Sequence, residues 1–129
     1  MTVLASIHDG PLDHPPPPFP CAGAGAVVRF EGLVRPWEDG RTIRGLRYEV
    51  YEPMAREMLV AIGQELLQGF GLVAICVEHS KGLVLAGECS FRLQVAGRHR
   101  QESLAAMSAM IDRMKQDVPI WKTAVAGDP

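Results

Sequence analysis

The sequence predicts an α+β domain in which two helices pack on a mainly antiparallel sheet. Two segments carry apolar residues at helical spacing, and several short β-branched or alternating runs lie between and before them. The last two of these runs are close enough in the chain to form a hairpin. With 129 residues, 47% of them hydrophobic and 22% charged, the chain fits one globular domain with its own core, so residues 1–129 are treated as a single domain. Helices segregated from an antiparallel sheet define the α+β class.

Composition excludes several classes of protein. No stretch approaches the roughly 18 uncharged apolar residues of a membrane-spanning helix, and the opening MTVLASIHDG lacks the basic and apolar segments of a secretory signal. The net charge of −2 argues against general nucleic-acid binding. Three cysteines without C-x-x-C spacing predict neither a zinc site nor a disulfide framework. We therefore expect a cytoplasmic protein that binds neither membrane nor nucleic acid.

Proline and glycine dominate the first part of the chain. Residues 11–25 contain PLDHPPPPFP and then a glycine-rich stretch, which predicts an extended surface loop because proline lacks an amide hydrogen and fixes φ. The β-branched run 26–30 predicts a strand, whereas a phosphate-binding glycine loop would be followed by a helix. An Asp-Gly pair within residues 36–41 predicts a turn in a mobile loop. Alternation over residues 43–51 predicts a second strand.

A first helix is predicted directly after this strand. Pro53 suits the first helical position, because that position needs no amide donor. Gly69 is a suitable end. The apolar residues that recur at helical spacing, and so predict the buried stripe, are Met54, Met58, Leu59, Ile62 and Leu66.

The remaining elements are a hairpin and a second helix. Strands are predicted over residues 72–79 and 88–96, with residues 82–87 in the connection between them. The second helix is predicted over residues 99–116, followed by a short polar tail, residues 123–129. The residues expected on the buried face of this helix are Leu104, Met107, Ile111, Met114 and Val118.

Residues that could carry chemistry are few. There is no G-x-S-x-G motif, and the four histidines show neither helical i, i+4 pairing nor an acidic cluster beside them, so no metal site and no cofactor are predicted. Cations do gather at the ends of predicted elements. Arginine offers a planar fork for phosphate, a helix N-terminus favours an anion, and a lysine among other cations has a lowered pKa. The pattern is compatible with ordinary solvated charge or with a small anionic ligand and proton transfer. The cations are Arg35, His99, Arg100, Lys115 and Lys122.

Four separated motifs carry a more specific signal. They are residues 25–35 (GAVVRFEGLVR), residues 46–55 (LRYEVYEPMA), the pair His99-Arg100, and residues 111–122 (IDRMKQDVPIWK). In order and separation they resemble the signatures of the large, catalytic subunit of molybdopterin synthase. This resemblance covers about residues 24–122 and implies a domain of the α/β-hammerhead type.

The resemblance also implies a reaction and a partner. In this family a small ubiquitin-like subunit carries a thiocarboxylate on its C-terminal Gly-Gly, and its tail enters a pocket of the large subunit. Two sulfur deliveries convert cyclic pyranopterin monophosphate into the dithiolene of molybdopterin. The chain would therefore be a sulfurtransferase that works with its thiocarboxylated partner and needs no cofactor of its own.

Site residues follow from matching this chain to the family motifs. Lys115 and Lys122 match the lysines expected to act in the pocket, with Lys115 close to the incoming thiocarboxylate. The residues matched to substrate binding are Phe30 as a pocket wall, and Arg35, His99 and Arg100 as ligands of the pterin phosphate or terminal carboxylate.

The chain also departs from the family pattern. The proline loop replaces a helix, Ser80 stands where an arginine is common after His79, and Thr123-Ala124 replaces a basic-acidic pair. The altered pair His79-Ser80 and the short tail favour a second hypothesis, in which the chain is a non-catalytic paralogue that keeps the partner groove as a binding module. Retention of both pocket lysines favours the enzyme.

The spacing of the matched residues predicts a homodimer. His99 and Lys115 lie sixteen positions apart on one predicted helix, which separates them by roughly 24 Å at 1.5 Å per residue. Two residues so far apart cannot touch one small pterin. We therefore expect His99 and Arg100 of one subunit to complete the site of its two-fold mate, giving a heterotetramer with two small subunits.

Overall fold

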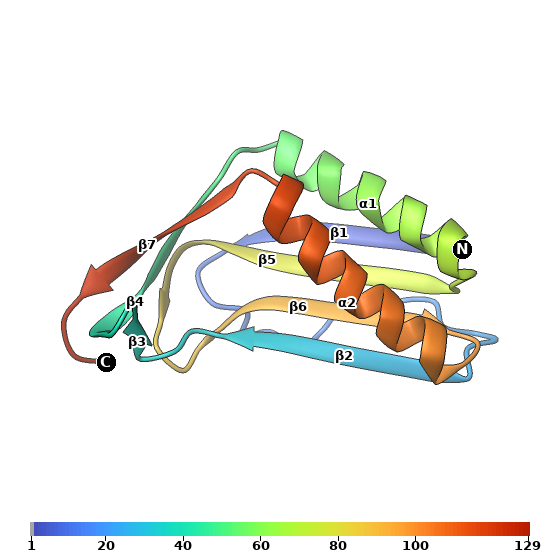
Figure 1. Cartoon of the computed structure of the whole chain (residues 1–129), viewed down its shortest axis with the longest axis horizontal. Helices are drawn as coiled ribbons and strands as arrows, with labels where there is room; N and C mark the ends of the chain where they lie inside the picture. The colour runs from blue at the N-terminus through green and yellow to red at the C-terminus, as the bar shows by residue number, and fades with distance from the viewer. Residues whose placement is uncertain (1) are drawn as a thin grey trace.

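A computed structural model describes residues 2–129 and places both helices on one face of a seven-stranded sheet (Figure 1). The strands are β1 (Thr2–Asp9), β2 (Ala26–Leu33), β3 (Trp37–Glu38), β4 (Arg41–Val50), β5 (Ala74–Leu85), β6 (Cys89–Gly97) and β7 (Ile120–Ala126). The helices are α1 (Met54–Phe70) and α2 (Arg100–Asp117). The predicted α+β class is confirmed, and no helix within residues 2–129 combines the length and apolar character that crossing a bilayer requires.

The long strand β5 connects the two parts of the sheet. Along its first part it pairs in parallel with β1 and antiparallel with β6, which in turn pairs with β2. Near its end it pairs with β4, which also pairs with β7 and β3. A Cβ at Gly45 would collide with the Val84 carbonyl, so β4 and β5 approach closely where the second part begins. All pairings except β1–β5 are antiparallel.

The core lies between the helices and the first part of the sheet. On α1 the residues Leu59, Ile62 and Leu66 face the strands, as their helical spacing predicts. α2 buries Met107, Met110 and Met114 against the same layer. A separate small cluster fills the second part of the sheet; its members are Val34, Ile43, Leu46 and Val84.

Several predicted elements need correction. The first strand, β1, was not predicted, and the predicted polar tail is occupied up to Ala126 by β7. The expected mobile loop contains the short strand β3, and the expected connection 82–87 is largely the end of β5. On α2, Leu104 is 53% exposed, although its spacing predicted burial. On α1, Met54 is exposed, and Pro53 is the N-cap where we predicted the first helical residue.

The proline-rich loop, residues 11–25, covers the sheet face that carries no helix (Figure 1). Side chains alternate along strands, and Val77 and Leu93 belong to the helix-side core, so Glu78 and Arg92 face the opposite side. Arg92 donates a hydrogen bond to the carbonyl of His14 in this loop. The loop is irregular, as predicted, and it is also packed: Leu12 is buried.

Candidate functional site

A cavity of about 450 Å³ lies where the two parts of the sheet meet the C-terminal end of α2. Its walls come from the end of β2, the segment through β3, the middle of β4, the start of β6, and β7. Four of the six residues predicted to form a site contribute to its lining: Phe30, Arg35, Lys115 and Lys122. The fold therefore brings together residues that span 92 positions of the chain.

The inner wall of the cavity is aromatic. Phe91 lies 5.9 Å, centroid to centroid, from both Phe30 and His79. Tyr48 meets the His79 ring edge-on at 5.1 Å and shares a hydrogen bond of 2.9 Å with the Ser90 hydroxyl. Phe30 thus lines this wall, and a flat ring could stack against the surface.

His79 is the buried histidine of this wall, with 5% exposure. Burial lowers its pKa, and the Ser80 carbonyl that accepts a hydrogen bond from Nδ1 offsets this only in part. The ring is therefore neutral at physiological pH. A neutral, fixed imidazole contributes shape and a weak dipole to the cavity, while the positive charge comes from the rim.

Cations and one carboxylate form the rim. Lys122 Nζ lies 3.3 Å from Glu38 Oε2, and Arg35 Nη2 lies 3.8 Å from Glu38 Oε1. Lys115 lines the rim from the last turn of α2, and Trp37 lines it from β3. Three cations facing one carboxylate leave a net positive charge that suits a small anion such as a phosphate or a terminal carboxylate.

His99 and Arg100 are not part of this cavity. His99 is the N-cap of α2, 75% exposed at its side chain, and lies at the opposite end of the helix from Lys115 (Figure 1). The helix runs unbroken between them. Within one chain the structure therefore separates the predicted residues into two groups.

Sequence reasoning missed several cavity residues. Glu38 of β3 and Tyr48 of β4 come close to Lys122 of β7 because β4 pairs with both other strands. In the β4–β7 pair, Tyr48 stands opposite Lys122. Ser90 is brought in by the hydrogen bond with Tyr48. The two tryptophans, Trp37 and Trp121, are more than half exposed at the cavity. The signal available in the sequence was the position of the two tryptophans close to proline residues, where large aromatic side chains are often exposed for binding.

None of the cysteines is a candidate nucleophile at the cavity. Cys76 is buried, and burial raises its pKa to about 11, so it is a protonated thiol at neutral pH. Burial also raises the pKa of Cys89. Cys21 lies exposed on the proline-rich loop. None of the three lines the cavity.

Fold and cavity together define an α+β domain with an aromatic, cation-rimmed pocket of a size and charge that suit a small anion. The family model described as "MoaE protein" matches residues 18–117. The molybdopterin synthase catalytic subunit of Bacillus subtilis is 38% identical over 105 residues, which cover 81% of this chain and 67% of that protein. The catalytic subunit of Oryza sativa subsp. indica is 41% identical over 105 residues, 81% of this chain and 54% of that protein. The chain belongs to the MoaE family.

Solved structures agree with this assignment. The chain is similar to molybdopterin synthase from Staphylococcus aureus, with a TM-score of 0.76 and 34% identity over 83% of this chain and 78% of that one. It is also similar to the complex of subunits 1 and 2 of molybdopterin-converting factor from Helicobacter pylori, with a TM-score of 0.75 and 28% identity. That match covers 93% of this chain and 83% of the other. The chain spans about half to two thirds of the length of the rice and Bacillus relatives.

Proposed function

We propose that the chain is the catalytic subunit of a molybdopterin synthase, a sulfurtransferase. It would move sulfur from the thiocarboxylated tail of a small ubiquitin-like subunit to cyclic pyranopterin monophosphate. The observation that carries the proposal is the cavity itself, where Phe30, Arg35, Lys115 and Lys122 converge from β2, the loop after it, α2 and β7. Relatives named molybdopterin synthase catalytic subunit support it.

Each rim residue has a distinct role in this proposal. Lys115 lies beside the entering thiocarboxylate and moves protons or orients the tail. Lys122, which pairs with Glu38, is the second lysine that acts in the pocket. Arg35 binds the phosphate or the terminal carboxylate through its planar guanidinium. Phe30 and Phe91 form the wall against which the pterin ring lies.

The separation of His99 and Arg100 from the cavity supports the second part of the proposal, a site shared between two copies of the chain. Both side chains are exposed at the far end of α2, where they are free to reach a neighbouring molecule. In a two-fold dimer this pair would complete the phosphate site of the mate. Two small subunits would then bind the dimer, giving a heterotetramer with two active sites.

Reconstitution tests the function directly. The chain, mixed with thiocarboxylated small subunit and cyclic pyranopterin monophosphate, is expected to form molybdopterin. A small subunit that lacks its last two glycines should still dock in part but deliver no sulfur, because only glycine passes a narrow channel without side-chain clash. Unchanged transfer from the truncated subunit would refute this mode of entry.

A non-catalytic paralogue is the alternative. Ser80, which stands where the family commonly has arginine, is fully buried, and its hydroxyl lacks a partner among the described residues. A cation common in the family is thus replaced by a small side chain, although Ser80 itself does not line the cavity. Docking of the thiocarboxylated partner without any molybdopterin formation would select this alternative. In either case we propose a cytoplasmic location, where biosynthetic relatives of this kind would work.

A further inference from the structure

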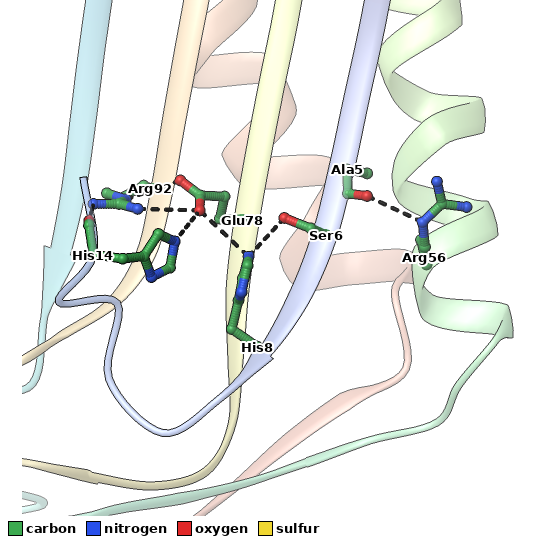
Figure 2. Close-up of polar contacts among 7 residues, drawn as sticks. All are labelled: Ala5, Ser6, His8, His14, Arg56, Glu78 and Arg92. Carbon is green, nitrogen blue, oxygen red and sulfur yellow. Dashed lines mark hydrogen bonds and ion pairs between the residues drawn. The ribbon is translucent and has the colours of Figure 1, made fainter. Parts of the chain in front are cut away.

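A second polar cluster lies on the other face of the sheet, under the proline-rich loop. Its residues are Ser6 and His8 of β1, His14 of the loop, Glu78 of β5 and Arg92 of β6 (Figure 2). Ser6 stands opposite Glu78, and Glu78 opposite Arg92, so three adjacent strands present these side chains in one row. The row belongs to the helix-free face and does not line the cavity.

Two imidazole nitrogens converge on one carboxylate oxygen in this cluster. Nε2 of His14 lies 2.8 Å from Glu78 Oε2, and Nε2 of His8 lies 3.3 Å from the same atom. The two rings are 4.6 Å apart, centroid to centroid. Figure 2 shows the two rings side by side, with both pointing at the Glu78 carboxylate. These three ligand atoms all lie within 4.8 Å of one another.

The Glu78 carboxylate is crowded with donors. Arg92 donates Nε to Glu78 Oε1 at 2.9 Å and Nη2 to Glu78 Oε2 at 3.0 Å. A carboxylate oxygen has about two lone-pair positions, and His14 at 2.8 Å takes the one that Arg92 leaves on Oε2, so the contact of His8 with this oxygen at 3.3 Å is not a hydrogen bond. Nε2 of His8 also lies 2.8 Å from the Ser6 hydroxyl, which gives that nitrogen two oxygen neighbours. A cation placed among the three ligand atoms would satisfy all of them at once.

We propose that His8, His14 and Glu78 form a binding site for a divalent transition metal of the zinc class. Two imidazoles and a carboxylate are the donors that zinc and its neighbours prefer, whereas magnesium and calcium prefer oxygen alone. Bonds of about 2.0–2.2 Å place the ligand atoms of a tetrahedral zinc site roughly 3.3–3.5 Å apart. The separation of His8 from Glu78, 3.3 Å, lies at this range, and the shorter separation of His14, 2.8 Å, has to widen by about half an ångström for an ion to enter.

The surroundings fit a metal site in two further respects. Glu78 is 1% exposed and Arg92 4% exposed, so the carboxylate is held rigidly by a buried guanidinium. Carboxylates that bind metals are commonly hydrogen-bonded in this way to a donor behind them. The side chains of His8 and His14 are 34% and 38% exposed, which leaves a path for the ion and room for small rotations. Three protein donors leave a fourth position for water beside the Ser6 hydroxyl.

Such an ion would fasten the proline-rich loop to the sheet. His8 lies near the end of β1, His14 in the loop, and Glu78 in the middle of β5. The three ligands therefore join segments that are otherwise linked here by the Arg92–His14 hydrogen bond and by backbone contacts. Binding would lower the freedom of residues 11–25 without touching the cavity. The site therefore carries a structural role that is independent of the proposed sulfur transfer.

Metal titration of the tag-free, full-length chain tests this proposal. After treatment with EDTA, the chain is expected to take up one equivalent of Zn²⁺ or Co²⁺, with ligand-field absorption for Co²⁺ typical of nitrogen and oxygen donors. Neither Mg²⁺ nor Ca²⁺ should compete at equal concentration. Zn²⁺ should also raise the melting temperature and slow amide exchange in residues 11–25. Failure to bind one equivalent, or preferential binding of Mg²⁺, would overturn the assignment.

Variants locate the ion. His8→Ala and His14→Ala should each weaken Zn²⁺ binding by at least about 100-fold, which exceeds the roughly 10–100-fold typical when a residue that only hydrogen-bonds to a ligand is replaced. His99→Ala, which removes an exposed histidine at the start of α2, should leave it unchanged. Glu78→Gln leaves Arg92 without its buried partner and can unfold the chain, so the exposed loop variant His14→Ala is the decisive one. If the double variant His8→Ala/His14→Ala binds Zn²⁺ like the wild type, the proposal is wrong.

Discussion

The ammonium group of Lys122 lies 3.3 Å from the carboxylate of Glu38, which also reaches Arg35 at 3.8 Å. One acidic side chain thus connects two cations that we propose as anion ligands. Both cations are more than half exposed at their side chains. Exposed pairs contribute only about 0.2–1 kcal/mol, so a substrate phosphate or carboxylate can displace Glu38 from either of them.

Removing this internal competitor should strengthen anion binding. Glu38→Gln is expected to raise the affinity of the chain for inorganic phosphate up to about fivefold, the factor that 1 kcal/mol represents. Isothermal titration calorimetry measures the change. Glu57→Gln, which removes a carboxylate in the first turn of α1, is the matched control. Weaker phosphate binding by Glu38→Gln would show that the carboxylate orients the cations instead of competing with substrate.

The two pocket lysines should be needed for turnover and dispensable for folding. Lys115→Ala and Lys122→Ala are each expected to lower the rate of molybdopterin formation roughly 10²-fold or more, the scale of one general acid–base or positioning group. Both side chains are exposed, so the melting temperature should change little. Lys81→Ala removes a lysine that pairs with Glu52 outside the cavity, and it should retain full activity. Near-normal turnover by Lys115→Ala would contradict its assignment.

A shared active site makes two inactive variants complement each other. His99→Ala and Lys115→Ala subunits, each inactive alone, should recover about one working site in every mixed dimer. The physical reason is the length of α2, which keeps its two ends apart in one chain and leaves the second copy to supply the missing group. Activity is measured after subunit exchange, with exchange verified by mass-labelled chains. Exchange without recovery would refute the shared site.

Burial of His79 should make stability sensitive to mild acid. Its pKa in the folded state lies below the ordinary value of about 6.5. The unfolded state therefore takes up the proton first, and stability falls as pH drops through about 6.5 toward the lower folded pKa. Urea unfolding between pH 7.5 and 5.5 measures this slope. His79→Asn, which keeps a donor for the Ser80 carbonyl, should show a smaller decrease; an equal decrease would assign the effect to other groups.

The helices were the most predictable part of the fold, because apolar spacing on α1 reports directly on packing. The error at Leu104 shows the limit of this signal. Leu104, Met107 and Ile111 are related by spacings of three and four, but the face that α2 buries is turned toward Ser103, Ala106 and Met110, which leaves Leu104 exposed. The strand β1 was missed because its partner, β5, is remote in the sequence and a parallel pair has no local turn to mark it. The strand β7 was missed because it is mostly exposed, so its apolar and polar residues do not alternate as they do in a strand with one buried face.

Only those residues of the candidate site that belong to the family motifs could be predicted from the sequence. Motif matching named Phe30, Arg35, Lys115 and Lys122, and the structure places all four at one cavity. Their individual roles remain predictions. Glu38 escaped because its place depends on the pairing of β3 with β4. The His8, His14 and Glu78 cluster escaped because its spacing in the sequence matches no metal motif; strand register and the path of the loop create it.

The parallel pairing of β1 with β5 bears on how the chain reaches its native state. Thr2 stands opposite Ala74, so this pair closes a loop that contains more than half of the chain. Closing such a loop costs entropy before its contacts form, and domains dominated by non-local strand pairing fold in milliseconds to seconds. The hairpin of β5 and β6 is local by comparison. We therefore expect β1 to dock late on that hairpin, so that substitutions in β1 mainly speed unfolding and leave the folding rate almost unchanged.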